Sequence, residues 1–441
     1  MSTALSRRRF LAMPAAFGAA SLLPGGFAAA LAEEAPPMPD LSDWGKVRAQ
    51  FDLDPAWLHF ASFYLASHPK PVRDAVEAWR RAIDRDPYQT VEHNGYSEDP
   101  AEWVPGHVLA AIAGYVGGRA GDIALTHNTT EGLALVYHGL PLKPGDEVLA
   151  TAHDHYSHIT SIAYATRRAG ASMRRIALYE DAATATTDAM VGRLLQAVSP
   201  RTRVVGLTWV HSSTGMRLPV REMADALKER HPDVLLVVDG VHGFGSTDVA
   251  AATLGADYFC AGCHKWMFAP RGTGMIWASA ENWARLTPIV PDFSEIEGWN
   301  AWIEGRERKG PTTAERMTPG GFQAFEHQWG ALAAFRMHEA MGRARVGARI
   351  RELNDQLKAG LAGIRKVRLH TPMSGELSAG LVAFEVDGLK PEDVVKRLLQ
   401  ARIVASSSPY AVSYARLAPS LVNTPEEVER AVRAVRAIAG A

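Results

Sequence analysis

Cysteine is nearly absent from this 441-residue chain, which contains two. Two thiols cannot build a disulfide framework or a four-thiolate zinc site. Net charge is also small, at −1 from 47 basic and 48 acidic side chains. That balance gives no electrostatic case for a nucleic-acid partner, since nucleic-acid-binding proteins concentrate basic residues on one face. The composition therefore excludes a disulfide-framed miniprotein and argues against nucleic-acid binding.

Long hydrophobic runs, internal repeats and low-complexity tracts are missing after residue 32. No later stretch offers the roughly 18 consecutive apolar residues that a membrane span needs, so we expect a soluble mature protein. The hydrophobic share of 47% is nevertheless that of an ordinary globular protein. A chain of this length exceeds what one compact core usually supports, which predicts about two domains.

The first 32 residues differ from the rest of the chain. Residues 6–11 read Ser-Arg-Arg-Arg-Phe-Leu and precede a weakly apolar stretch that prolines and glycines interrupt. Small residues at positions 30 and 32 fit the pattern before a signal-peptidase site. The segment resembles a twin-arginine export signal, which implies export of the folded protein by the twin-arginine machinery to the bacterial periplasm and cleavage near Ala32. A membrane anchor is the weaker reading, because the apolar run is short and interrupted.

Short apolar runs alternate with helical patterns between about residues 105 and 280. Because these runs lack polar alternation, they predict strands covered on both faces, as in a mainly parallel α/β sheet. Residues 291–321 are polar and contain glycine, and we expect loops there. The C-terminal part has the pattern of a smaller α+β domain. The predicted organisation is a signal peptide at 1–32, an N-terminal arm at 33–65, a large domain at 66–325 and a small domain at 326–441.

The most informative segment joins an aspartate to a lysine 26 residues later. Asp239 follows an apolar run and therefore lies where a buried strand ends, which is where α/β sheets bind ligands. Lys265 follows a second apolar segment, beside His264 and before a glycine-rich turn. Pyridoxal phosphate (PLP) requires both residue types, a lysine for the Schiff base and a carboxylate that keeps the ring nitrogen protonated. A helix-capping aspartate and a solvated lysine form the structural alternative, which the joint pattern disfavours.

Four motifs occur together in one order: Thr-His-Asn-Thr-Thr-Glu-Gly at 126–132, Asp-His-Tyr-Ser-His at 154–158, the Asp239 motif and His264-Lys265. In order and spacing they resemble the class V aminotransferase-fold enzymes, which include cysteine desulfurases, selenocysteine lyases, kynureninases and isopenicillin N epimerase-like proteins. The resemblance covers about residues 55–435, and the isopenicillin N epimerase-like branch looks nearest. It implies the fold type I architecture of PLP enzymes, with a large sheet domain, a small domain and a homodimer whose active sites are shared.

The resemblance assigns roles around the cofactor ring. Lys265 would form the internal aldimine and later move the proton, Asp239 would pair with the pyridinium nitrogen, and His155 would stack on the ring. His242 lies where the family reaches the phenolic oxygen of the cofactor, and Ser212 lies where many members place Asn.

Further residues would bind the phosphate of the cofactor and the substrate. Thr129 and Thr130 lie at a predicted strand-to-helix junction, where backbone N–H groups and hydroxyls bind phosphate. By resemblance, His264 would add a phosphate contact, and Thr318 would reach the phosphate of the neighbouring subunit. Arg416 matches the family's arginine that holds the substrate carboxylate, and the fork of donors on a guanidinium suits that task.

Two groups of side chains have other interpretations. His153, His155 and His158 could be drawn as a zinc site, but His158 would need a turn to join the other two, and we predict no metal site. Cys260 and Cys263 have a C-x-x-C spacing, yet they do not open a helix, so structural cysteines are the favoured reading.

The segment before Arg416 contains no thiol, since residues 404–410 read Val-Ala-Ser-Ser-Ser-Pro-Tyr. A cysteine desulfurase needs a mobile thiol at this place, so desulfuration through a persulfide is disfavoured, whereas direct β-elimination stays open. Residues 63–69 resemble twin-arginine-exported family members associated with the maturation of peptide siderophores. We expect a periplasmic enzyme acting at the α-carbon of an amino acid or of a residue in a modified peptide, by transamination or oxidative tailoring first, then epimerisation, then β-elimination. A catalytically inactive binding protein is the non-enzymatic alternative.

Overall fold

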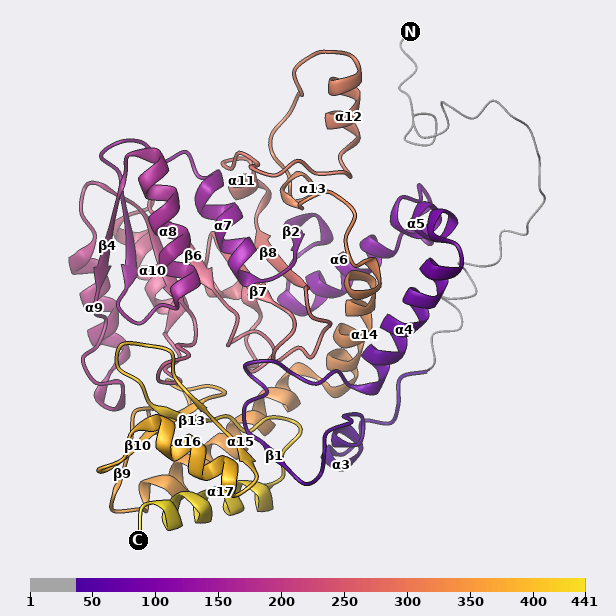
Figure 1. Ribbon diagram of the computed structural model, residues 1–441. Helices are drawn as coiled ribbons and strands as arrows, with labels where there is room; N and C mark the ends of the chain where they lie inside the picture. Colours follow the sequence, from indigo (N-terminus) through magenta and orange to yellow (C-terminus); the bar gives the residue numbers. More distant parts are fainter. Residues whose placement is uncertain (1–36, 441) are drawn as a thin grey trace.

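The computed structural model describes residues 37–440 (Figure 1). The predicted export signal and its cleavage near Ala32 lie outside these residues. A large sheet domain and a smaller C-terminal domain lie against each other (Figure 1), although the residue boundaries given above for them stay predictions. Within residues 37–440, no helix is both long enough and apolar enough to cross a membrane.

A seven-stranded sheet forms the centre of the large domain. Its strands lie in the order β2-β8-β7-β6-β5-β3-β4, and among them β8 runs antiparallel to both of its neighbours. The strands are β2 (Ile123–Thr126), β3 (Glu147–Thr151), β4 (Ser172–Ile176), β5 (Thr202–Thr208), β6 (Leu235–Asp239), β7 (Tyr258–Gly262) and β8 (Gly274–Ala278). The predicted mainly parallel sheet is confirmed.

Helices cover both faces of this sheet. Successive residues of a strand enter different cores, because side chains alternate along a strand, and Val237 and Val238 of β6 are one such pair. The face of Val237 is covered by α7 (Thr129–Gly139) and α8 (Tyr156–Ala169). The opposite face is covered by α6 (Val104–Val116), α9 (Thr187–Ala197) and α10 (Val220–Arg230). Burial on both faces explains the continuous apolar runs, and β4 lacks one because it is a largely exposed edge strand.

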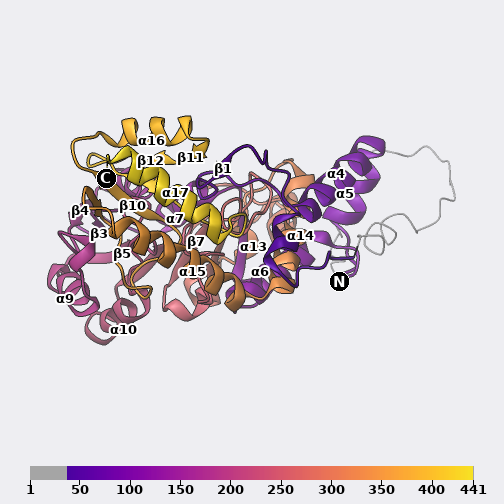
Figure 2. The same cartoon turned by 90° about the horizontal axis from the view of Figure 1, so that it is seen from below.

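The N-terminal arm connects the two domains. It contains α3 (Trp44–Arg48) and β1 (Leu58–His59), and β1 pairs in parallel with β11 (Ile403–Val404) of the small domain. Next come α4 (Lys70–Arg85) and α5 (Pro87–Gly95), and α4 packs along α14 (Phe325–Met341). The turned view places α4 and α5 at the end of the molecule opposite to the strands β3 and β4 (Figure 2).

Residues 291–321 differ from the expected loops, because they contain α12 (Ile296–Ile303) and α13 (Ala314–Met317). The start of α13 is fixed locally, since the Thr313 hydroxyl accepts a hydrogen bond from the N–H of Arg316. Glu295, which precedes α12, is ion-paired with Arg308 beyond its end. Polar side chains of this stretch thus form capping contacts and ion pairs around short helices. Shorter helical turns elsewhere are α11 (Ala280–Trp283), η1 (Ala120–Asp122), η2 (Ala182–Thr184) and η3 (Ala251–Leu254).

The small domain has its own core, with helices packed on an antiparallel sheet of order β12-β13-β10-β9. Its strands are β9 (Val367–Leu369), β10 (Val382–Val386), β12 (Ser406–Ser407) and β13 (Ala415–Leu417). Its helices are α15 (Arg343–Ala362), α16 (Pro391–Gln400) and α17 (Pro425–Ile438). Thr424 and Glu427 form a capping box at the start of α17, which fixes where the chain turns after β13.

Candidate active site

The predicted site residues gather at the carboxyl ends of the parallel strands. Asp239 is the last residue of β6, and Lys265 follows β7. His155 follows β3, and Ser212 follows β5. Carboxyl ends of parallel strands meet at one edge of the sheet, which is the edge where α/β folds bind ligands.

Lys265 is partly buried beside His242, with 3.3 Å between its Nζ and the Nε2 of the histidine. Burial lowers the pKa of Lys265 to about 8, because the ammonium loses hydration there. The charge of Asp239 opposes this shift in the pKa of Lys265, and that of Arg416 adds to it. A lysine with such a pKa is partly neutral near physiological pH, and the neutral amine is the form that reacts with an aldehyde.

Asp239 is 2% exposed, and its Oδ1 accepts the N–H of Val241 at 3.1 Å. Burial raises the pKa of Asp239, while His158, Val241 and Lys265 hold it partly down. Within residues 37–440 this carboxyl group has no ion-pair partner closer than 4 Å. A buried carboxylate that lacks a cationic partner fits a protonated ring nitrogen, which would supply one.

His155 caps the start of α8. Its Nδ1 accepts the N–H of Ser157 at 3.3 Å and lies 2.9 Å from the hydroxyl of that residue. A nitrogen that accepts a backbone N–H carries no proton, so the neutral ring has its hydrogen on Nε2. Burial and the charges of Lys265 and Arg416 lower the pKa of His155, which keeps the ring neutral. The ring is therefore fixed in orientation, as a stacking partner for a planar cofactor requires.

The start of α7 lies against the end of β7. Thr129 is the first residue of α7, and its Oγ1 accepts the N–H of Gly262 at 2.7 Å. A Cβ at residue 262 would lie 2.8 Å from Cε1 of His264 and 3.2 Å from the Thr129 hydroxyl, so a side chain at residue 262 would crowd both groups. The Nδ1 of His264 is buried and has no hydrogen-bond partner in the described part of the chain. Together with Thr130, these groups fit a phosphate at a helix N-terminus.

Arg416, in β13, is 5% exposed and reaches across to the large domain. It donates to the carbonyl of Ser212 at 2.6 Å, to the carbonyl of Ser407 at 3.0 Å and to the hydroxyl of Ser406 at 3.2 Å. Its guanidinium also lies over the ring of Phe63, 4.8 Å from the centroid.

These contacts leave the charge of Arg416 uncompensated. Three of the five N–H groups of a guanidinium are engaged, and no carboxylate in residues 37–440 pairs with it. Burial lowers the pKa of Arg416 to about 10, and the group still carries its charge at neutral pH. A buried cation with free donors is the arrangement that a substrate carboxylate would complete.

Sequence reasoning missed Tyr410 as a site residue. Its hydroxyl lies 2.6 Å from Oγ of Ser212, and its ring lies edge-on to His155 with 6.3 Å between centroids. Burial raises the pKa of Tyr410 to about 12. Its position in the sequence could have indicated a role, since Tyr410 ends the segment 404–410, in which a desulfurase would need its thiol.

Thr318 lies beside β2, and its hydroxyl is already engaged within the chain. It accepts the N–H of Leu125 at 3.1 Å and donates to the carbonyl of Ala314 at 3.2 Å. A hydroxyl has one more acceptor lone pair but no second hydrogen for a phosphate. The contact with the phosphate of a neighbouring subunit therefore stays a prediction that would require this hydroxyl to change partners.

The alternative groups of the sequence have other partners. The ring of His153 stacks on Tyr179 with 4.0 Å between centroids, and Nε2 of His158 lies 2.7 Å from the Tyr137 hydroxyl. In the described chain, no three residues among His, Cys, Asp and Glu converge in a way that could hold a metal ion. Cys260 and Cys263 are free and buried, and burial raises the pKa of both thiols, to about 12 for Cys263.

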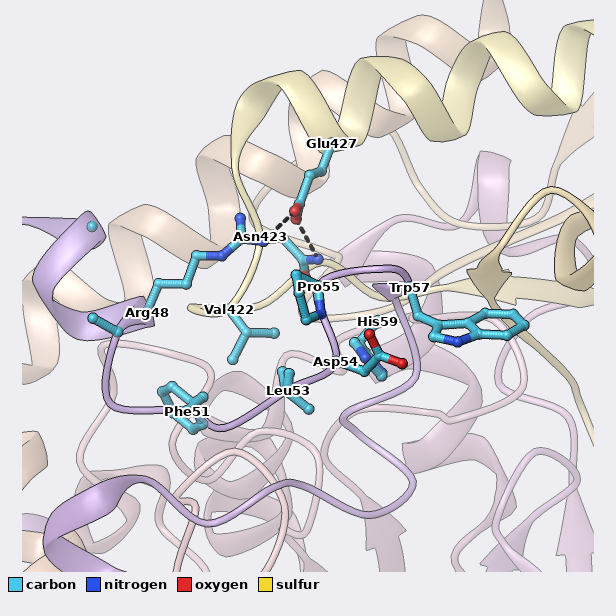
Figure 3. Close-up of a pocket in the computed structure, with 12 residues that line it drawn as sticks. Arg48, Phe51, Leu53, Asp54, Pro55, Trp57, His59, Val422, Asn423 and Glu427 are labelled. Carbon is cyan, nitrogen blue, oxygen red and sulfur yellow. Dashed lines mark hydrogen bonds and ion pairs between the residues drawn. The ribbon is translucent and has the colours of Figure 1, made fainter.

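A cavity of about 300 Å³ lies between the N-terminal arm and the start of α17 (Figure 3). Arg48 and Glu427 form an ion pair at its wall, and Trp57 and His59 also line it. None of the predicted site residues lines this cavity, so it is separate from the candidate active site.

Comparison with known proteins places the chain among related sequences and folds. The aminotransferase class-V family model matches residues 108–433. An isopenicillin N epimerase of Streptomyces clavuligerus is 26% identical over 411 residues, which cover 91% of this chain and 99% of the epimerase. A probable cysteine desulfurase of Vibrio cholerae is 24% identical over 342 residues, which cover 74% of this chain and 80% of the desulfurase.

A likeness to solved structures concerns the fold. A C-DES mutant with glycine covalently linked to its PLP cofactor matches with a TM-score of 0.77 at 21% identity, covering 90% of this chain and 99% of that one. The predicted fold type I architecture, with its large mixed sheet and its smaller antiparallel sheet, is thereby confirmed.

Proposed function

Because the chain belongs to the aminotransferase class V family, we propose that it is a PLP-dependent epimerase that inverts the α-carbon of an amino acid or of an amino-acid residue in a peptide. The observation that carries the proposal is the hydroxyl of Tyr410, which shares Ser212 as a hydrogen-bond partner with Arg416. It gives the site a second acid/base group besides Lys265. Inversion needs such a pair, since a proton that leaves one face of the α-carbon must return on the other.

The residues present fit PLP, which would supply an electron sink for the charge that develops at the α-carbon. Lys265 would hold it covalently, and Asp239 would pair with its ring nitrogen. Thr129, Thr130 and His264 would bind its phosphate at the start of α7. His155 would lie against the ring, held in place by Ser157. Arg416 would bind the substrate carboxylate with its two free N–H groups.

Lys265 and Ser212, the hydrogen-bond partner of Tyr410, follow the two strands that flank β6. Lys265 follows β7, which pairs with β6 along one edge, and Ser212 follows β5, which pairs with β6 along the other. Tyr410 is bonded to Ser212, and its pKa of about 12 keeps the hydroxyl protonated. The lowered pKa of Lys265 increases the fraction of neutral amine, which is the form that accepts a proton. One group is therefore prepared to accept a proton and the other to donate one.

The relatives support epimerisation over the transamination that the sequence led us to expect first. The match to the Streptomyces clavuligerus epimerase covers 91% of this chain. The cysteine-desulfurase relatives do not carry the proposal, because residues 404–410 contain a tyrosine where a thiol would be needed, and Cys260 and Cys263 are buried. Transamination would need Lys265 alone, and direct β-elimination would need a leaving group on the β-carbon.

The cellular setting is part of the proposal. Residues 1–32 would direct the folded, cofactor-loaded protein through the twin-arginine machinery to the periplasm. The substrate there would be an amino acid or a residue of a modified peptide such as a siderophore. The enzyme would act as a homodimer, in which Thr318 would lie near the cofactor phosphate of the partner subunit.

The proposal is tested by following the α-proton in D2O. Purified holoenzyme is incubated with the common L-amino acids, free and at the C-terminus of short peptides, and products are scored for deuterium, configuration, keto acid and sulfide. Wild-type enzyme should give the D-isomer with deuterium at the α-carbon. Keto acid or sulfide without inversion would contradict epimerisation, and lack of a visible cofactor band would indicate a binding protein.

Tyr410→Phe separates the two acid/base groups. We expect inversion to fall by about 10²–10⁴-fold, whereas exchange with retention through Lys265 continues. Tyr414→Phe is the matched control, because Tyr414 lies four residues after Tyr410 but stacks on His370 with 3.8 Å between centroids. Equal inversion by Tyr410→Phe and wild type would remove the observation on which the proposal rests.

A further inference from the structure

Trp266, the residue after Lys265, turns its indole back towards His242. It is 2% exposed, and its Nε1 donates to Nδ1 of His242 at 3.4 Å. The other nitrogen of the same ring, Nε2, lies 3.3 Å from Nζ of Lys265. His242 is itself 5% exposed, so bulk water does not compete for these contacts. Three side chains therefore form one continuous hydrogen-bonded row.

The donor and acceptor atoms of this row can be assigned by asking where each hydrogen lies. An indole N–H only donates, so Nδ1 of His242 must be the acceptor and carries no hydrogen. Burial lowers the pKa of His242 far below its usual value, and the charges of Lys265 and Arg416 lower it further. The ring is thus neutral, and its single hydrogen must lie on Nε2. A ring that accepted from Trp266 and from an ammonium of Lys265 together would hold no hydrogen at all, so the Nε2–H of His242 can be hydrogen-bonded only to the neutral amine of Lys265.

We propose that Trp266 is a positioning residue that fixes the Nε2–H tautomer of His242 and so presents a hydrogen-bond donor to Lys265. On the proposed function, in which Lys265 carries PLP, this donor serves twice. It favours the neutral amine that reacts with the cofactor aldehyde, and it stays available for an oxygen of the bound cofactor once the amine is engaged.

The small domain holds the indole in place. Gly380 has a φ of 68°, and a Cβ there would lie 2.6 Å from Cζ2 of Trp266. Gly245 has a φ of 82°, and a Cβ there would lie 2.9 Å from the carbonyl carbon of Trp266. Glycine at these two positions lets the backbone of the small domain approach the indole and the backbone of the large domain approach the main chain of Trp266. The donor that sets the tautomer is therefore rigid, as a positioning group must be.

The first test reads the tautomer directly and needs no cofactor. Long-range ¹H–¹⁵N NMR of histidine-labelled, cofactor-free protein distinguishes Nδ1–H from Nε2–H, and His242→Gln identifies the signals of His242. Wild type should show Nε2–H. Trp266→Phe keeps the aromatic ring but lacks the donor, and should give a mixture of tautomers. A wild-type Nδ1–H tautomer overturns the inference whether or not the variant folds, as does an unchanged tautomer in Trp266→Phe.

Trp329→Phe is the matched control. Trp329 is 1% exposed, and its Nε1 is buried without a hydrogen-bond partner in the described chain. The substitution removes the same atoms from a buried indole without removing a hydrogen bond. We expect the tautomer of His242 to be unchanged in this variant, and a shift there equal to that in Trp266→Phe would contradict the inference.

The second test measures the pKa of Lys265 in cofactor-free protein by NMR of ¹³C-labelled lysine. The charged and titratable groups that face Lys265 are Asp239, Arg416, His155, His242 and His264. Without Trp266, Nε2 of His242 is free to accept from the ammonium, so the pKa should rise by about one unit, a tenfold loss of neutral amine at a given pH. Trp329→Phe should leave this pKa unchanged, and an unchanged or lowered value in Trp266→Phe contradicts the proposal.

The two failures can be told apart. A wild-type protein that shows the Nε2–H tautomer but binds no PLP would refute the proposed function and leave the tautomer assignment in place. A PLP-binding protein with the Nδ1–H tautomer would refute the role of Trp266 and leave the proposed function in place.

Discussion

The candidate site has two halves that are built in different ways. The cofactor half consists of Asp239, which ends β6, His242, which follows β6, and Lys265, which follows the neighbouring strand β7. The substrate half consists of Ser212, Tyr410 and Arg416, which come from both domains. Its hydrogen bonds join residues 198 and 204 positions apart, whereas the bond between His242 and Lys265 spans 23. The cofactor half is thus a property of one sheet, and the substrate half exists only while the domains are docked.

The halves also differ in charge. In the cofactor half Asp239 faces the positive potential of Lys265, and His242 stays neutral. In the substrate half the guanidinium of Arg416 is buried among carbonyl and hydroxyl oxygens and has no carboxylate partner in residues 37–440. A buried charge without a counter-ion is costly unless a ligand completes it. Each half thus holds a buried charge that has no ion-pair partner in residues 37–440, a carboxylate in the first half and a guanidinium in the second.

Replacing Lys265 should have the largest effect. On the proposed function, Lys265→Ala removes the covalent attachment and the proton acceptor together, so we expect loss of the visible cofactor band and a fall in turnover of about 10²–10⁴-fold or more. Borohydride reduction followed by mass spectrometry checks the attachment, and Lys143→Ala, at an exposed lysine, serves as the control. A reducible adduct that persists in Lys265→Ala would place the cofactor elsewhere.

Arg416→Lys should break the substrate half and spare the cofactor half. Lysine keeps the charge but loses the fork that donates to three oxygens and that, on the proposed function, would also bind the substrate carboxylate. Losing one or two charge-assisted hydrogen bonds raises KM by about 10–100-fold, while the cofactor band should stay. Steady-state kinetics and absorbance measure the two halves separately. Equal loss of both signals would show that the halves are not independent.

The same contrast explains what could be predicted from the sequence. Asp239 and Lys265 follow apolar runs that can only be buried strands, and parallel strands bring their carboxyl ends together whatever the rest of the chain does. Tyr410 could not be found in this way, because its partner Ser212 is 198 residues distant and depends on how the small domain docks. Trp266 stands next to Lys265 in sequence, yet no periodicity tells whether its indole faces the core or His242.

The fold follows the same rule. The central strands were predictable because burial on both faces leaves an apolar run, whereas β4 has exposed side chains and leaves none. The helices α12 and α13 escaped prediction because capping and the Glu295–Arg308 pair stabilise them in a polar stretch. The family resemblance predicts a phosphate contact for the hydroxyl of Thr318. That hydroxyl is engaged with Leu125 and Ala314, which only the packing against β2 could reveal.

Acid should weaken the core behind the cofactor half. His338 is 1% exposed and stacks on Phe268, and burial lowers its pKa to about 4. The unfolded chain binds a proton at this residue from about pH 6.5 downwards, whereas the folded chain resists until about pH 4. Stability from this group is complete above pH 6.5 and is lost as the pH falls, by about 2 kcal/mol at pH 5. The free energy of urea unfolding, measured above pH 6.5 and at pH 5, gives the size of this loss.

The control for this prediction is a pair of variants. His338→Gln should reduce the difference in unfolding free energy between neutral and acid pH, because glutamine does not titrate. His231→Gln, at the partly exposed end of α10, should leave that difference as it is in wild type. An acid-induced loss that is the same in all three proteins would mean that other groups determine it.

The smallest expected effect tests whether the halves communicate. With a pKa of about 8, Lys265 is mostly ammonium at pH 7, so capture of PLP by the cofactor-free protein should be about tenfold slower there than on the alkaline plateau. The charge of Asp239 raises this pKa and that of Arg416 lowers it. Asp239→Asn should therefore move the inflection of the capture rate to lower pH, and Arg416→Gln should move it to higher pH. Stopped-flow absorbance measures these rates. If Arg416→Gln leaves the pH of the inflection unchanged, the charge of the substrate half does not influence the pKa of Lys265.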